Sequence, residues 1–217
     1  GNANFCCSKF RFYGRVILKR HGRYTAGVET QYEPSLITGA QNHQHLASGY
    51  PVGKRFHSAP VIRLGDAKPM QLGHVLRADG RWRIVIFAPA SDTGRADGPV
   101  GTLCAGLAGL MNSVTPAGQD IDAVIDTRAV FQTAHREMDF SKLPTLLRPS
   151  KGQFGLTDYE KAFCPAQGQG DIFDMRGIGR IEGAAIVIRP DQHVALVTPV
   201  TAAQEIKDFF AKVLGPE

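Results

Sequence analysis

The sequence has few cysteines and none in a redox or metal-binding arrangement. Its 217 residues include only Cys6, Cys7, Cys104 and Cys164, and no two of them form a CxxC pair. The adjacent Cys6 and Cys7 cannot close a relaxed disulfide, and the spacing of the four fits no paired zinc motif. We therefore expect reduced thiols, no metal site and an intracellular, cytoplasmic protein.

Long apolar runs and nucleotide-binding motifs are missing as well. No uninterrupted stretch approaches the roughly 20 apolar residues that a membrane helix needs, and the start lacks the apolar centre of a signal peptide. No GxGxxG follows an early strand, and no P-loop lysine is present. These absences argue against a membrane partner and against a dinucleotide site in this chain.

An excess of charge of one sign occurs only near the N-terminus. The net charge of +5 comes from 25 basic and 20 acidic side chains that are mixed along most of the chain. Much of the excess precedes Glu29, the first acidic residue, and lies in Lys9, Arg11, Arg15, Lys19, Arg20 and Arg23. Because the rest is balanced, we expect no nucleic-acid partner. The hydrophobic content of 43% is typical of a folded domain.

The pattern of apolar residues divides the chain into two parts. Residues 1–53 show little periodicity, and ITGAQNHQHLASGYPVG is rich in Gly, Asn, Gln and His, which is typical of a linker. From residue 54 the apolar pattern sharpens. We expect an N-terminal extension and linker over 1–53 and a single domain over 54–217.

The pattern within 54–217 predicts an ordered series of strands and helices. Asp79-Gly80 between two apolar runs predicts a hairpin turn, and RIVIFA predicts a central strand covered on both faces. The last predicted helix has Thr201 as N-cap and Gly215 as C-cap. The other predicted elements are strands near 60–64, 70–76, 120–130, 183–190 and 193–200, a turn at 66–69, a helix at 100–114 and a short helix at 157–163.

Strand-helix-strand followed by hairpin-helix is the order of a thioredoxin-like domain, an α/β fold with a mixed sheet. In a redox thioredoxin, the loop after the first core strand carries CxxC at a helix start. Residues 89–94, PASDTG, occupy that place here. Cys104 lies inside the following helix among small apolar residues, so we expect a buried packing role. The predicted fold is thioredoxin-like but lacks CxxC and follows an irregular linker.

Several motifs resemble one known family. KRFHSAPVIRLGDAKPMQLGH, ADGRWRIVIFA, LTDYEKAFCP, DIFDMRGI and VIRPDQHVALVTP occur in the order found in the C-terminal region of FAD-dependent aromatic hydroxylases, the phenol 2-monooxygenase and 3-hydroxybenzoate 4-monooxygenase group. The likeness runs from about Tyr24 to the end. It implies that a flavin domain and a substrate domain precede this region, and that the thioredoxin-like domain contributes to dimer contacts.

The resemblance also implies where the chemistry lies. The whole enzyme would use NAD(P)H and FAD to hydroxylate a phenolic ring with oxygen. The residues that bind flavin and substrate belong to the preceding domains, so no catalytic, cofactor-binding or metal-binding residue is assigned to this chain. Whether the chain is an enzyme stays open. The expected partners are a second copy or the flavin domain, and the alternatives are a thioredoxin-fold oxidoreductase or a small-ligand-binding module.

Two motifs, one in the linker and one just after it, resemble catalytic or metal-binding sites, but a structural role explains each of them better. His43 and His45 form HxH without an acidic neighbour in sequence, which favours a solvated or interface role over zinc. Arg55, His57 and Ser58 lack the positioned acid and oxyanion hole of a triad. We expect these three side chains to pin the linker to the domain.

Acidic residues give a second group of candidates. Asp120, Asp122 and Asp126 alternate along a predicted strand, and we expect solvated or strand-end roles for them. Asp158 and Glu160 would lie at the start of the short helix, where they oppose its dipole.

The remaining candidates are loops and aromatic side chains. SDTGRADGPVG has the composition of a phosphate-binding loop but not its motif, and Tyr24, Tyr32 and Tyr50 are expected to anchor the linker by packing. Arg189, Pro190, Asp191 and Gln192 predict a turn whose charges tie it to nearby backbone or to the flavin domain.

Overall fold

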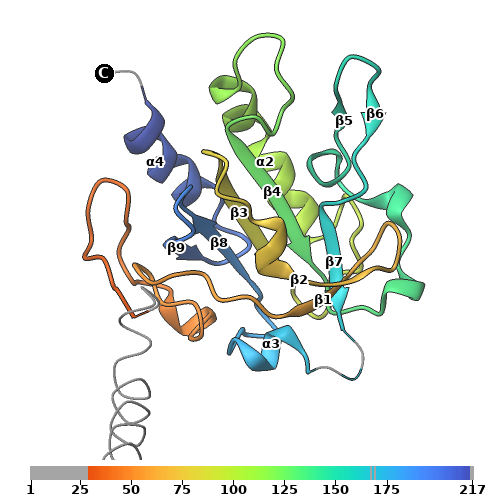
Figure 1. Cartoon of the computed structure of the whole chain (residues 1–217), viewed down its shortest axis with the longest axis horizontal. Helices are drawn as coiled ribbons and strands as arrows, with labels where there is room; N and C mark the ends of the chain where they lie inside the picture. Colours follow the sequence, from red (N-terminus) through yellow and green to blue (C-terminus); the bar gives the residue numbers. More distant parts are fainter. Residues whose placement is uncertain (1–28, 167, 169, 216–217) are drawn as a thin grey trace, which may run out of the picture.

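A mixed sheet of seven strands forms the centre of the protein (Figure 1). The computed structural model describes residues 29–166, 168 and 170–215. The strand order is β2-β1-β7-β4-β3-β8-β9. Their bounds are β1 Pro60–Arg63, β2 Pro69–Gln71, β3 Trp82–Phe87, β4 Ile125–Val130, β7 Ala162–Pro165, β8 Ala184–Ile188 and β9 Val194–Thr198.

Helices and a second hairpin complete the architecture. Among the described residues, the helices are α2 Pro99–Val114, α3 Ile172–Met175 and α4 Ala203–Leu214, and five short 3-10 turns lie at Gln44–Leu46, Leu72–Val75, His135–Glu137, Phe140–Lys142 and Thr145–Leu147. Strands β5 Ser150–Lys151 and β6 Leu156–Thr157 pair with each other. In the described part of the chain, no helix is long and apolar enough to cross a bilayer.

Strands β4, β3, β8 and β9 with helices α2 and α4 form the thioredoxin-like unit. β3 and β4 are parallel and are joined through α2, while β8 runs antiparallel to β3 and forms a hairpin with β9 before α4. The predicted thioredoxin-like fold with a mixed sheet is therefore confirmed. Strands β1, β2 and β7 extend the sheet on the β4 side.

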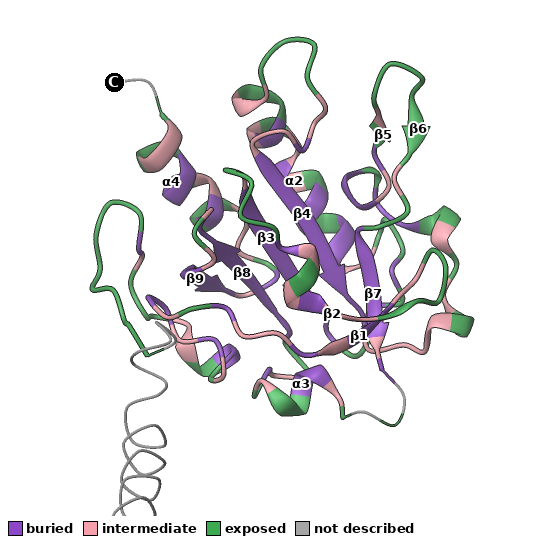
Figure 2. Cartoon of the chain, viewed as in Figure 1, coloured by how far each residue is buried: buried purple, intermediate pink, exposed green. Residues whose placement is uncertain are grey.

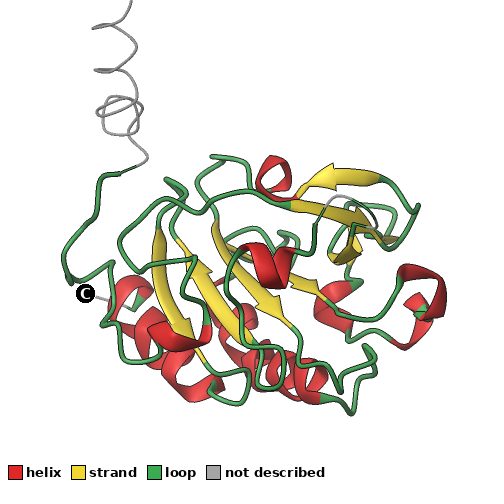
Figure 3. Ribbon diagram, turned by 90° about the horizontal axis from the view of Figure 1, so that it is seen from below, coloured by secondary structure: helices red, strands yellow, loops and turns green. Residues whose placement is uncertain are grey.

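Each face of the sheet has its own core, because successive side chains of a strand point to opposite faces. Ile84 and Ile86 face α2 and α4, where they meet Leu103 and Phe210. The two long helices lie along one side of the sheet in Figure 3. Figure 2 shows that the central strands are buried throughout, as expected for RIVIFA.

The opposite face is covered by the segment from Leu46 to Phe56 together with α3. Val85 and Phe87 of β3 pack there against Tyr50, Val52 and Phe173. The rings of Tyr50 and Phe56 stack with centroids 4.2 Å apart. The linker thus contributes Leu46, Ala47, Tyr50 and Val52 to the core on this face and does not hang free from the domain.

Three predicted local features are wrong. The segment predicted as a helix over 157–163 contains the end of β6 and the start of β7, because Phe163 and Cys164 are buried between β1 and β4. Asp158 and Glu160 therefore lie at no helix start. Helix α4 begins after Ala202 without a side-chain cap, so Thr201 is not its N-cap, whereas Gly215 is the C-cap as predicted.

The third correction concerns the first hairpin. It joins β1 to β2 through the predicted turn at 66–69, and β2 is not paired with β3. Gly80 has the expected positive φ of 83°. Asp79 uses its carboxylate to accept hydrogen bonds from Arg81 and Arg83 instead of closing a hairpin.

Candidate functional site

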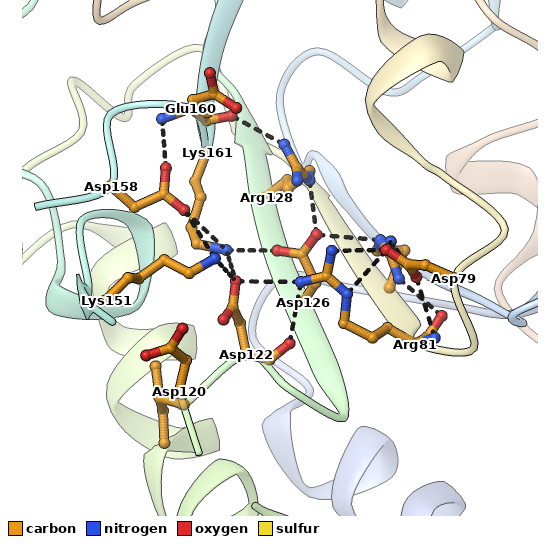
Figure 4. Close-up of polar contacts among 12 residues, drawn as sticks. Asp79, Arg81, Asp120, Asp122, Asp126, Arg128, Lys151, Asp158, Glu160 and Lys161 are labelled. Carbon is orange, nitrogen blue, oxygen red and sulfur yellow. Dashed lines mark hydrogen bonds and ion pairs between the residues drawn. The ribbon is translucent and has the colours of Figure 1, made fainter. Parts of the chain in front are cut away.

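A cluster of buried charges spans the three parallel strands of the sheet (Figure 4). We call it the ion cluster, and its buried members are Arg83, Asp122, Asp126, Arg128 and Lys161. Asp126 and Arg128 alternate along β4 and so share one face, and Lys161 immediately precedes β7. The cluster lies on the sheet face that the linker covers, beyond the apolar packing of Val85 and Val130.

Lys161 is the centre of the ion cluster. Its Nζ lies 2.6 Å from Asp122 Oδ2 and 2.5 Å from Asp126 Oδ1. The other oxygen of Asp126 faces two guanidinium groups, at 2.9 Å from Arg128 Nε and 3.1 Å from Arg83 Nε. The contact with Arg83 Nε has the distance of an ion pair but not the geometry of a hydrogen bond. Both buried carboxylates therefore have more than one cationic partner.

The surrounding charges explain the protonation states. Burial alone raises the pKa of the Asp122 carboxyl, but the ammonium groups of Lys161 and Lys151 outweigh it and bring the pKa to about 2. Burial likewise raises the pKa of Asp126, and the charges of Arg128 and Lys161 more than reverse that effect, so the pKa is lowered. Both groups are carboxylates at neutral pH and are not poised to exchange protons there.

The expected solvated role of Asp122 and Asp126 is wrong. They are 3% and 0% exposed, and each binds Lys161 from across the sheet. Asp120, by contrast, accepts the backbone N–H of Gly152 at 2.8 Å and remains half-buried. Because an uncompensated buried charge costs several kcal/mol, the cluster fixes the relative positions of β3, β4 and β7.

The small hairpin β5–β6 is attached to the rim of the ion cluster. We call residues 150–159 the arm, and Figure 1 shows it projecting from the sheet. Lys151 Nζ lies 2.9 Å from Asp122 Oδ2 and 3.5 Å from Asp158 Oδ2. The hydrogen bond from Gly152 to Asp120 adds a second tie between the arm and the start of β4. The cluster therefore holds the arm as well as the sheet.

The loop at residues 89–94 has no thiol and is built around a carboxylate. Asp92 is buried and accepts the backbone N–H groups of Gly94 at 2.8 Å and Val100 at 2.7 Å, so it satisfies one N–H of the first turn of α2. Cys104 is buried within α2, and burial raises the pKa of its thiol to about 12. Burial has the same effect on the pKa of Cys164, again to about 12. Neither thiol has the lowered pKa of a redox cysteine.

The other sequence candidates also have plain structural roles. His43 Nε2 lies 3.2 Å from Glu205 Oε2 of α4, an acidic partner that is remote in sequence. Arg55 donates to the Gln192 side chain at 2.8 Å, and Ser58 accepts the N–H of Gly73 at 2.9 Å, so both fasten the segment just after the linker to the domain. Among the described residues, no three His, Cys, Asp or Glu side chains come together as a metal site.

Comparison with known proteins agrees with this architecture. Residues 30–217 match the family described as phenol hydroxylase, C-terminal dimerisation domain. The chain belongs to this family. The predicted resemblance to phenol 2-monooxygenase and 3-hydroxybenzoate 4-monooxygenase enzymes is thereby confirmed.

The relatives of this phenol hydroxylase dimerisation domain are longer proteins, and the chain matches only a part of each. The chain is 50% identical over 199 residues to a 3-hydroxybenzoate 4-monooxygenase of Comamonas testosteroni, covering 88% of this chain and 31% of the relative. It is 32% identical over 212 residues to the FAD-dependent monooxygenase terD of Aspergillus terreus, covering 93% and 34%. The chain therefore spans about a third of the length of these relatives.

Among solved structures, a thiol:disulfide interchange protein from Bacteroides sp. matches with a TM-score of 0.47 and 10% identity, covering 74% of this chain and 91% of that one.

The α2 start of the phenol hydroxylase dimerisation domain does not fit the pyrophosphate of FAD. A helix N-terminus binds phosphate through free backbone N–H groups. Here Asp92 already occupies the N–H of Val100, and its negative charge would repel a phosphate. No step of flavin chemistry is therefore assigned to these residues.

The turn at Arg189 is the docking point of the linker in the dimerisation domain. Arg189 binds Asp191 at 2.5 Å and donates to Thr38 Oγ1 at 3.1 Å, and its guanidinium lies 4.6 Å from the centre of the Tyr32 ring. Gln192 has a positive φ of 68°, which closes the predicted turn. Tyr32 and Tyr50 anchor the linker as expected, whereas Tyr24, Cys6, Cys7 and the six N-terminal basic residues lie outside the described residues.

Proposed function

We propose that this chain is the C-terminal dimerisation part of a longer FAD-dependent monooxygenase that hydroxylates an aromatic ring, and that alone it forms homodimers and catalyses no reaction. The observation that carries the proposal is the family match over residues 30–217, in a chain that spans about a third of its relatives. FAD and NAD(P)H would be bound by the preceding domains of the longer enzyme.

The internal chemistry of the domain supports a structural role. At the helix start that could bind phosphate, the carboxylate of Asp92 accepts the N–H of Val100, and the thiols of Cys104 and Cys164 are buried with raised pKa values. The carboxylates of the ion cluster are neutralised by cations. These features favour a scaffold over both an oxidoreductase and a ligand-binding module.

We further propose the division into a linker at 1–53, which continues a substrate domain, and a C-terminal domain at 54–217. At this boundary the backbone pairs with the edge of β9, since Gly53 donates to Val194 O and Val194 donates to Lys54 O, both at 2.8 Å; Gly39 in the linker also donates to Ala195 O at 2.7 Å. The DNA sequence upstream of the Gly1 codon tests whether this chain is part of a longer enzyme. An open frame that encodes a flavin-binding domain is expected, and an in-frame stop codon would contradict it.

The function of the chain itself is tested by two measurements on the purified 217-residue protein. Sedimentation velocity over a range of concentrations should show a reversible dimer. Titration calorimetry with FAD, phenol and 3-hydroxybenzoate should give no saturable heat. A monomer at every concentration would refute the dimerisation role, and a saturable aromatic ligand would favour the ligand-binding module.

A further inference from the structure

We propose that the arm, residues 150–159, is the surface through which two copies of this domain meet. The proposal rests on the dimerisation function proposed above and assigns that function to particular side chains. Phe154, Leu156 and Tyr159 would form the centre of a two-fold contact, with the charged residues at the base of the arm around it.

The arm exposes large apolar side chains that its own fold does not cover. Phe154 is 78% exposed, Leu156 is 68% exposed and Tyr159 is 53% exposed. They are three of the eight exposed large hydrophobic side chains among the described residues, and they lie within six consecutive positions. Single exposed apolar residues are ordinary, but a contiguous group marks an interaction surface.

The arm is held in place at its base, so that its tip can be presented in a fixed orientation. A two-stranded hairpin is marginally stable in water by itself. Here Lys151 is tied to Asp122, and the ring of Tyr159 stacks on Phe140 at 4.5 Å. Preorganisation of this kind lowers the entropic cost of binding because less of the surface must be ordered on contact.

The charges that flank the apolar group favour a second copy as the occupant. In a two-fold interface the same patch meets itself, so a patch of one sign would repel its image. The arm, the neighbouring 3-10 turn and the residues next to them carry both signs within a short span, namely Lys142, Lys151, Asp139, Asp158 and Glu160. These charges are paired within the chain, Lys142 with Asp139, Lys151 with Asp122 and Asp158, and Glu160 with Arg63, so the patch has little net charge and does not repel its own image.

A second group of exposed apolar side chains, Tyr32, Leu36 and Ile37, also lies within six positions, but it is less exposed, at 42%, 66% and 38%, and its Tyr32 ring packs against His193 and Arg189. Ile181, at 87% exposed, lines the cleft beside Pro89 and Ser91, and Met175 is 48% exposed at the end of α3. Each belongs to a different element from the arm, so they provide matched control positions. In the described residues, β5 and β6 pair only with each other, which leaves the arm outside the seven-stranded sheet.

Charge insertion at the apolar tip is the first test. The double variant Phe154→Asp/Leu156→Asp should raise the dimer dissociation constant in sedimentation velocity by about 100-fold or more, because apolar anchors dominate interfaces. The control variant Ile181→Asp should leave the constant unchanged within about threefold. Thermal unfolding and circular dichroism of each variant confirm folding, which is expected to persist since the replaced side chains are exposed.

Cross-linking is an independent second test. In a Cys6→Ser/Cys7→Ser background, Gln153→Cys should give a covalent dimer with a short bis-maleimide, and Glu182→Cys should not. A wild-type chain that is always monomeric would refute the proposed function. A wild-type dimer that survives the double variant, or that cross-links at position 182 and not at 153, would overturn the assignment of the arm while leaving the proposed function standing.

Discussion

The ammonium group of Lys161 lies 2.6 Å from the carboxylate of Asp122, and neither side chain has appreciable contact with solvent. The two residues are 39 positions apart in sequence, and the pair joins the start of β7 to the segment before β4. Replacing a buried ion pair as a whole can be neutral, but removing one partner leaves a buried charge uncompensated. The consequences of breaking this pair can therefore be measured.

Replacing Lys161 with Met should destabilise the domain strongly. Met has a similar length and is apolar, so the loss of packing is small and the main effect is the loss of a cation beside Asp122 and Asp126. We expect the free energy of unfolding to fall by about 3 kcal/mol or more. Urea denaturation followed by circular dichroism measures this change.

Lys142→Met is the matched control for that experiment. Lys142 pairs with Asp139 at 3.2 Å, but both side chains are about half exposed. An exposed pair of this kind contributes little to the free energy of unfolding. Equal effects of Lys142→Met and Lys161→Met would contradict the structural role of the ion cluster.

Acid should weaken the ion cluster in a defined pH window. The folded-state pKa of Asp122 is lowered to about 2, below its unfolded value of about 3.9. The folded state then binds fewer protons than the unfolded state, so this stabilisation is present above about pH 4 and is lost as pH falls towards 2. Urea midpoints measured from pH 6 to pH 2 should decline across that window.

Two variants separate Asp122 from the other acids. Asp122→Asn should be less stable at pH 6 and should lose less additional stability between pH 4 and pH 2 than the wild type. Asp97→Asn, which alters a fully exposed carboxylate, should follow the wild-type curve. If Asp122→Asn lost stability between pH 4 and pH 2 as steeply as the wild type, the Asp122 carboxylate would not be the group that makes the domain sensitive to acid.

The sequence was informative where one segment determines its own structure. RIVIFA and the runs after Gly183 and His193 are dense in β-branched residues, and the helix after Pro99 has a clear apolar period, so β3, β8, β9 and α2 could be predicted. β7 could not, because its short apolar core AFC is extended only through pairing with β1 and β4. Tertiary pairing overrides the local preference there.

The ion cluster was missed for a related reason. A sequence shows that Asp122 and Asp126 are acidic, but whether they are solvated depends on cations brought by other strands. One signal was available: Arg83 interrupts an otherwise apolar strand run, and a charge in such a run needs a partner of opposite sign. The register that places Arg83 beside Asp126 follows only from the parallel pairing of β3 and β4.

The buried thiols should react slowly with alkylating or disulfide reagents in the native state. In a Cys6→Ser/Cys7→Ser background, Cys104 and Cys164 have pKa values of about 12 and no access to solvent, so little thiolate forms. Their labelling by a chromogenic disulfide at pH 8 should follow the unfolding rate and accelerate in guanidinium.

An added surface thiol gives the positive control for the labelling experiment. Ser91→Cys, in the same background, introduces a cysteine at an exposed position of the loop where a redox thioredoxin carries its motif. It should label within seconds to minutes without denaturant. Equally rapid native labelling of Cys104 or Cys164 would instead support an oxidoreductase.

Arg189→Ala should loosen the linker without unfolding the sheet. The substitution removes the contacts of Arg189 with Thr38, Asp191 and the Tyr32 ring, so we expect a loss of about 1–3 kcal/mol. Hydrogen exchange should accelerate first in residues 30–39, and in the longer enzyme the chemical step should stay nearly unchanged. Arg95→Ala is the control, because Arg95 pairs only with exposed Asp97 in the contacts described. Unchanged exchange in residues 30–39 would show that Arg189 does not hold the linker.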